Sequence, residues 1–182
     1  IEPSNQFATA MGIRDVYAGF RPRSPNYSRT FPVSSIESYA EMDRFAVDVA
    51  NRVSHGEEES WHATKYCLIE LIRNVFDHSG AKPFVCAQQM KKGHAGRTTD
   101  RVQIVVSDAG TGIFGALSGY HKWVETDSMA IDAALQPHIS GTFAKGCFSQ
   151  MRDNAGIGLF FVSEMVKLTD GRMLIGRETT FV

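Results

Sequence analysis

Two stretches of helical periodicity, followed at once by a strand-like hairpin pattern, constrain this chain more than any other feature. Apolar residues recur at helical spacing over residues 36–53 and again over 68–76. Residues 83–90 and 101–107 instead have the character of strands, and the second alternates apolar and polar positions. The two strands should pair as an antiparallel hairpin, and together with the helices they predict an α+β fold.

Capping residues predict where these helices begin. Ser34 and Glu37 have the spacing of a capping box, in which each side chain bonds a backbone N–H of the first turn. Residues 30–33 form a short strand candidate before that box. The acids at residues 57–59 suit the positive N-terminus of the second helix.

The rest of the chain is less regular. Residues 91–100 are polar, contain two glycines and predict the turn of the hairpin. Residues 113–154 lack a clear period apart from a helical piece at 128–135, and a long insert of this kind is often functional. Periodicity returns in a helix over 156–168 and a strand over 172–175.

Length and composition limit the class of protein. The 182 residues fit one domain, which we expect at 30–182 after an N-terminal arm at 1–29. A net charge of -1 gives no indication of a nucleic-acid partner. No apolar run approaches the roughly 18 residues of a membrane span, and the first residues are no signal peptide, so we expect a cytoplasmic protein with reduced cysteines. The start without Met and the strand-like end predict a domain cut from a longer chain.

The first chemical motif is the series Glu70, Asn74 and His78, whose spacing of four places all three on one face of the second helix. An amide oxygen together with ATP phosphates suits Mg²⁺, so Asn74 is the candidate metal ligand. A carboxylate one turn earlier can accept a proton, which makes Glu70 the candidate catalytic base. Alternatively, these are polar residues on the solvent side of an amphipathic helix.

Two further motifs contain glycines next to regular elements. Asp108, Gly110 and Gly112 follow a strand directly, where the carboxylate can accept a hydrogen bond from the adenine amine; a simple turn with an Asx bond is the alternative. Gly156 and Gly158 open a helix whose N–H groups can bind phosphate, or they ease the packing of that helix.

The order of these motifs resembles the ATP-binding domains of the GHKL superfamily, which includes histidine kinases, gyrase and heat-shock-chaperone ATPases. The resemblance implies a Bergerat-type fold, a two-layer α/β sandwich whose mixed, mostly antiparallel sheet carries helices on one face. It also implies ATP and Mg²⁺ as cofactors, with a mobile lid at residues 113–155. The residues implied to contact the nucleotide are Asn74, Asp77, His78, Asp108, Gly110, Gly112, Ile113, Gly156, Ile157, Gly158, Leu159 and Thr179.

The use made of the γ-phosphate stays open at this point. The series from Glu70 to Asp77 resembles the hydrolysing ATPases, whereas Asn74 with His78, Ser79 and Gly80 also resembles anti-sigma serine kinases and some sensor kinases. A phosphorylating enzyme of signal transduction would need a protein phosphoacceptor. A nucleotide-gated protein-interaction module with little or no turnover is the alternative.

Overall fold

The computed structural model describes residues 30–94, 97–141 and 156–176, and these divide between two compact units. The first unit contains residues 30–65 and Pro83–Ser107. The second unit contains Tyr66–Lys82 and the described residues from Asp108 onward. The arm predicted at 1–29 lies outside the described residues, so the predicted domain boundary stays a prediction.

The first unit is built on a three-stranded antiparallel sheet in the order β1-β2-β3. Strand β1 spans Thr30–Ser35, β2 spans Phe84–His94 and β3 spans Arg97–Ser107. The register of β2 with β3 is unbroken from Phe84 opposite Ser107 to His94 opposite Arg97, which confirms the predicted hairpin.

The turn predicted at residues 91–100 is wrong, because the two strands continue through most of that segment. Lys91 is in register with Asp100, and Lys92 with Thr99. Polar residues are compatible with a two-stranded ribbon, and threonine itself favours strands. The polar composition and the two glycines of residues 91–100 therefore led to a predicted turn that is too long.

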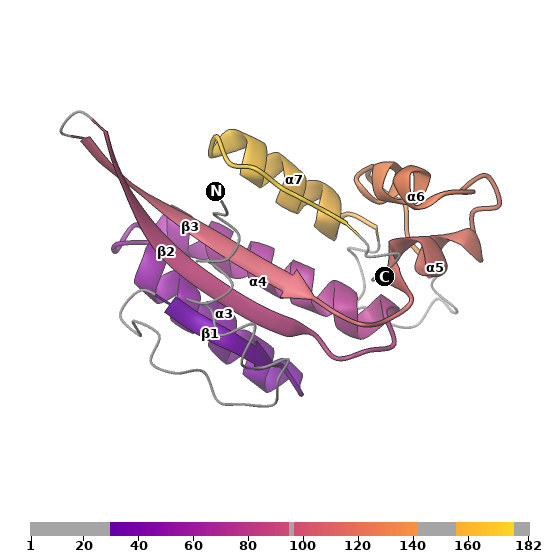
Figure 1. The fold of residues 1–182 in the computed structure, drawn as a ribbon, viewed down its shortest axis with the longest axis horizontal. Coiled ribbons are helices and arrows are strands. Elements are labelled where there is room, and N and C mark those ends of the chain that lie inside the picture. Colours follow the sequence, from indigo (N-terminus) through magenta and orange to yellow (C-terminus); the bar gives the residue numbers. More distant parts are fainter. Residues whose placement is uncertain (1–29, 95–96, 142–155, 177–182) are drawn as a thin grey trace, which may run out of the picture. The chain divides into compact units, whose positions relative to one another are not determined.

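Helix α3, Tyr39–Val53, covers one face of this sheet (Figure 1). It buries residues at helical spacing along one side: Met42, Ala46, Val49 and Ala50. The ring of Phe45 meets the ring of Phe31 on β1 edge-on, with centroids 5.9 Å apart. The guanidinium of Arg52 lies 4.0 Å from the centroid of the Phe31 ring, in the range of a cation–π contact.

The capping box predicted at Ser34 and Glu37 is wrong by one helical turn. Strand β1 continues through Ser35, so Ser34 is still paired with Val85 when the predicted helix should begin. The helix is capped instead by Ser38, whose hydroxyl accepts a hydrogen bond from the backbone N–H of Glu41 at 3.2 Å. The Glu41 carboxylate accepts one in return from the backbone N–H of Glu37 at 2.8 Å.

Helix α4, Glu58–His78, belongs to both units, since the division falls between Lys65 and Tyr66. Glu58 and Glu59 occupy its first turn, as predicted from the favourable interaction of acids with a helix N-terminus. Within the three described stretches, no helix is long and apolar enough to cross a membrane.

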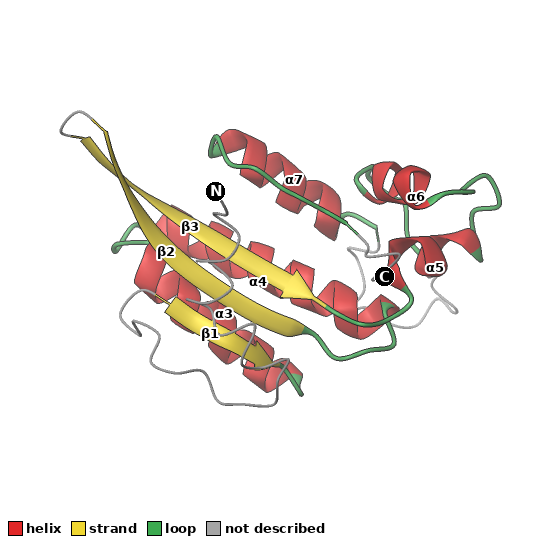
Figure 2. Cartoon of the chain, viewed as in Figure 1, coloured by secondary structure: helices red, strands yellow, loops and turns green. Residues whose placement is uncertain are grey.

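The second unit adds helices α5, Gly112–Ser118, α6, Asp127–Ala134, and α7, Gly158–Leu168 (Figure 2). Helices α5 and α6 and the segment between them share a small core of buried residues: Leu117, Val124, Ala130 and Ala133. The described part of the predicted lid, residues 113–141, is therefore a packed helical pair. Helix α6 confirms the helical piece predicted at 128–135, but α5 was not predicted because glycines weaken its helical signal.

The strand predicted at residues 172–175 is wrong, because the described residues after α7 have no regular structure. A strand needs a neighbour, and no pairing to this segment occurs within the described part of the chain. Leu174 is 97% exposed there. Five helices and an antiparallel sheet in the described residues agree with the predicted α+β class, whereas the parallel part of a mixed sheet is not found among them.

The observed cap allows a direct stability test. We expect Ser38→Ala to lower the free energy of unfolding by about 0.5–2 kcal/mol, because the N–H of Glu41 loses its acceptor. Ser34→Ala is the matched control, since Ser34 is exposed and lies in β1. Urea denaturation of both variants measures the difference, and a larger loss in the Ser34 variant would contradict the observed cap.

Candidate functional site

All the predicted site residues that the structure describes belong to the second unit. Glu70, Asn74 and His78 follow one another along α4, with Glu70 only 4% exposed and the other two half-buried. Asp77, on the same helix, is exposed. The predicted Thr179 lies outside the described residues.

Glu70 is a buried carboxylate with a defined partner. Its Oε1 receives a hydrogen bond and ion pair from Nη2 of Arg73, three residues along the helix, at 2.5 Å. A charge buried without such a partner would be strongly unfavourable, so Arg73 is what allows the acid to lie there. Sequence reasoning missed Arg73, although its spacing of three from Glu70 is the signal that could have found it.

Gly158, the first residue of α7, packs directly against the carboxylate of Glu70. A Cβ at Gly158 would collide with Oε2 of Glu70, so this position has room only for glycine. The same contact places a negative charge beside the N-terminus of α7, where the helix dipole favours it.

Two further contacts hold α7 along α4. The rings of Tyr66 and Phe161 meet edge-on at 6.5 Å, and the sulfur atoms of Cys67 and Met165 are 3.4 Å apart. Gly158 at the start of α7 lies against Glu70, whereas Phe161 and Met165 further along α7 contact residues that precede Glu70 on α4, so the two helices run antiparallel. Burial, with a smaller effect from the charge of Glu70, raises the pKa of the Cys67 thiol to about 11, so this cysteine is protonated at neutral pH.

The loop after β3 closes on the other end of this α4 segment. The backbone N–H of Thr111 donates to the carbonyl of Ser79 at 3.0 Å, and its hydroxyl donates to the carbonyl of His78 at 3.4 Å. These carbonyls belong to the last turn of the helix and its end, where no intrahelical donor remains. A Cβ at Gly110 would collide with the backbone of Ser79, so close approach requires a glycine here too.

Asp108 is exposed and makes the Asx turn that the sequence left as an alternative. One of its carboxylate oxygens accepts a hydrogen bond from the backbone N–H of Gly110 at 2.8 Å. Gly112 has φ +69°, a conformation that favours glycine, at the first residue of α5. The half-buried Ile113 follows it and packs on the core of α5 and α6.

The segment before α7 is also tied down. Gly156 has φ +81°, and its carbonyl accepts a hydrogen bond from the backbone N–H of His138 at 2.8 Å. A Cβ on Gly156 would come within 2.7 Å of the carbonyl oxygen of Ile139. Ile157 and Leu159 are half-buried on either side of the buried Gly158.

The three motifs are thus brought together on one segment of α4. The glycines in the loop after β3 and in the segment before α7 are also required by packing within the protein. The alternatives of a turn with an Asx bond and of eased helix packing therefore hold whether or not a nucleotide binds. Comparisons with known proteins find no protein similar to this chain. No protein-family model, no curated protein and no solved structure matches the chain.

The electrostatic state of His78 follows from its surroundings. Burial lowers its pKa below the ordinary value of 6.5; the neighbouring Asp77 opposes this shift, whereas Arg73 adds to it. The imidazole is therefore neutral at physiological pH.

The contact between Gly158 and Glu70 predicts a coupled pair of substitutions. Gly158→Ala should lower the free energy of unfolding by about 1–3 kcal/mol, because the new methyl group overlaps a buried carboxylate. Glu70→Ala creates space, so the same substitution should be less damaging in that background, as a double-mutant cycle by urea denaturation would measure. Gly119→Ala is the control, since a Cβ there meets nothing within 4 Å and its φ of -65° is helical. Equal losses from Gly158→Ala in both backgrounds would refute the contact.

The lowered pKa of His78 predicts a pH effect on stability. Above pH 6.5 the group is neutral in both the folded and unfolded states; below it, the unfolded state takes up the proton that the folded state resists. Stability should therefore fall as the pH drops through 6.5, and His78→Gln should reduce that fall. His62→Gln is the control because that side chain is 66% exposed. Unfolding free energies at about pH 7.5 and about pH 5.5 give the comparison. An unchanged pH dependence in the His78 variant would contradict the prediction.

Proposed function

We propose that the second unit binds Mg²⁺-ATP and uses it for protein phosphorylation or ATP hydrolysis, as the GHKL domains that its motifs resemble do. The described sheet and helices would then form part of a Bergerat-type fold. One observation carries this proposal: motifs separated by up to about 90 residues converge on the last turns of α4, from Glu70 to His78, and on the adjoining Ser79. If these motifs served only to pack the protein, there would be no reason for them to contact the same segment of α4 that contains Glu70 and Asn74.

The amide of Asn74 fits the metal. It lies on α4 one turn after Glu70, is half-buried, and forms no hydrogen bond with any other described residue. Its oxygen is thus available, and Mg²⁺ prefers a few protein oxygens together with phosphate oxygens and water. When bound, the ion would neutralise charge on the phosphates.

Glu70 would act as the base that accepts a proton from water or from a substrate hydroxyl. Its carboxylate is held in one position by Arg73 and by the close packing of Gly158. Phosphate bound near the N-terminus of α7 would experience repulsion from Glu70, and the guanidinium of Arg73 would offset it.

Asp108 would recognise the adenine. One oxygen of its exposed carboxylate accepts a hydrogen bond from the backbone N–H of Gly110, and the second would accept one from the exocyclic amine of the base. Guanine carries a carbonyl in place of that amine, so this arrangement would favour ATP over GTP.

The first test is a thermal-shift titration with ATP, ADP and GTP, each with and without Mg²⁺. Adenine nucleotides should raise the unfolding temperature, since a ligand of the native state stabilises it, and Mg²⁺ should increase the shift for ATP. No shift with any nucleotide would contradict the proposal.

Variants then separate the roles. Asn74→Ala should abolish the Mg²⁺-dependent part of ATP binding measured by calorimetry, whereas Gln136→Ala, which changes an exposed amide in the same unit, should retain it.

Glu70→Ala should retain ATP binding and lose phosphate release or transfer. Glu164→Ala is its control, because Glu164 also pairs with a base three residues away, Lys167, but on the surface. ATP binding without turnover in the parent protein would favour a nucleotide-gated interaction module.

A further inference from the structure

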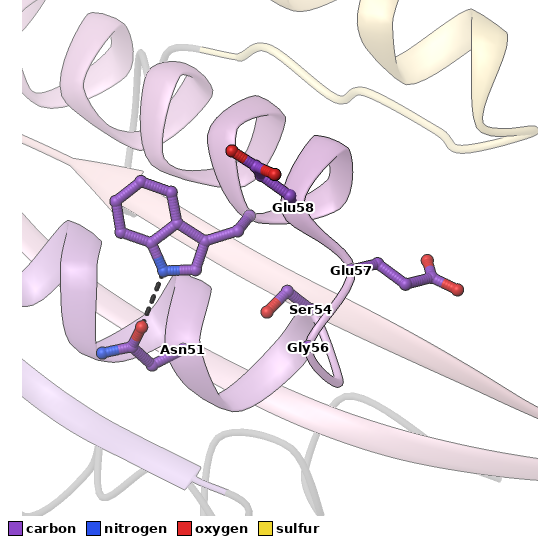
Figure 3. Close-up of a pocket in the computed structure, with 6 residues that line it drawn as sticks. Asn51, Ser54, Gly56, Glu57 and Glu58 are labelled. Carbon is purple, nitrogen blue, oxygen red and sulfur yellow. Dashed lines mark hydrogen bonds between the residues drawn. The ribbon is translucent and has the colours of Figure 1, made fainter.

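A separate pocket lies in the first unit, where α3 ends and α4 begins (Figure 3). Its volume is about 220 Å³, and its lining residues are Asn51, Ser54, Gly56, Glu57, Glu58 and Trp61. None of the residues assigned to the nucleotide belongs to it. Its chemistry therefore needs its own explanation.

The hydroxyl of Ser54 lines the pocket and is reached by solvent there. Ser54 is only 4% exposed, yet its side chain forms no hydrogen bond with any residue that the structure describes. Figure 3 shows the hydroxyl directed into the space beside Asn51. A hydroxyl that faces a pocket without a protein partner can accept a hydrogen bond from a ligand atom in place of water.

Trp61 forms a fixed aromatic wall. Its indole N–H donates to Oδ1 of Asn51 at 2.6 Å, which leaves the ring face rather than the N–H to contact a ligand. The ring of His62 meets the indole edge-on at 4.9 Å. The ammonium of Lys65 lies 5.4 Å from the indole centroid, within the range in which an aromatic face attracts a cation.

The charge of the lining is negative. Glu57 and Glu58 are its only ionisable residues, and Glu59 follows them along α4. Glu58 has a side chain 88% exposed and lies 3.7 Å from the imidazole of His62, which neutralises it only when protonated. Lys65 is paired with Asp43 at 2.9 Å, so its charge is already balanced.

We propose that this pocket binds a primary alkylammonium group. The alkyl chain would lie on the indole of Trp61, and the ammonium would donate a hydrogen bond to the Ser54 hydroxyl while facing the carboxylate of Glu58. A small free amine and a lysine side chain of a partner protein both present this chemistry.

Tryptophan fluorescence gives the test. The chain has two tryptophans, so Trp123→Phe leaves Trp61 as the only reporter. Titration with n-butylammonium should give a saturable change in emission, and n-butanol, the uncharged analogue, should not. A response that does not saturate, or one that butanol reproduces, would overturn the proposal.

Variants in the Trp123→Phe background assign the contacts. Ser54→Ala should weaken butylammonium binding about tenfold, the effect of losing a hydrogen bond to a charged group, and thermal melting checks that the variant is folded. Glu58→Gln should also weaken it, whereas Glu59→Gln, which changes the net charge equally but lies outside the lining, should not. Equal losses in the two glutamate variants would mean that general charge, rather than a built site, attracts the amine.

Two ligand probes then distinguish the sources of the amine. If N-acetyl-lysine methylamide binds and its ε-acetylated form does not, the site accepts a lysine side chain; if butylammonium binds but neither lysine compound does, it accepts a small free amine. Asn74→Ala should leave butylammonium binding unchanged, so this result is independent of the proposed ATP site.

Discussion

The second unit depends on a single buried charge, the carboxylate of Glu70. A carboxylate at 4% exposure is tolerated only with a partner, and Arg73 on the next turn supplies one. The same carboxylate determines what can begin helix α7, since only a glycine at position 158 leaves it room. Glu70 on α4 thus determines which residue can stand at the start of α7, more than 80 residues further along the chain.

The other end of this α4 segment is completed by a remote loop. The last carbonyls of a helix require donors, and the loop after β3 brings both the N–H and the hydroxyl of Thr111 to them. Thr111 precedes α5 but makes no side-chain cap to that helix, because its hydroxyl is directed to the carbonyl of His78. Contacts with α4 therefore help to position both α7 and the start of α5.

Sequence reasoning found what local periodicity determines. Both long helices, the hairpin, α6 and α7 were predicted from the spacing of apolar residues and the choice of glycine and acidic residues at their ends. The failures have different physical causes. Ser34 and Ser38 are equally good caps by composition, and only the pairing of β1 with β2 decides between them. The helix α5 was not predicted because its glycines lower the helix propensity of the segment. These glycines are present for reasons of packing and backbone conformation, which the sequence does not show.

For the site, the motifs indicated which residues to consider but not what they contact. Arg73 could have been found from its spacing to Glu70, whereas the bond between Thr111 and Ser79 joins residues 32 apart and has no local signal. The same holds for the pocket where α3 ends and α4 begins, whose lining residues are brought together by the fold. A sequence shows that Ser54 is present, and only a structure shows that its hydroxyl faces a pocket.

The length of the β2–β3 hairpin has a consequence for how this chain behaves in solution. Strand β1 pairs with β2 only as far as Gln88, so within the described residues the stretch from Met90 to His94 is a two-stranded ribbon. The outer edges of such a ribbon present backbone N–H and C=O groups that can pair with another molecule and start aggregation. The sequence of this stretch contains Lys91 and Lys92, and lysine in an edge strand is a residue type that disfavours such pairing. The polarity that obscured the strand in the sequence is thus of the kind that opposes self-association.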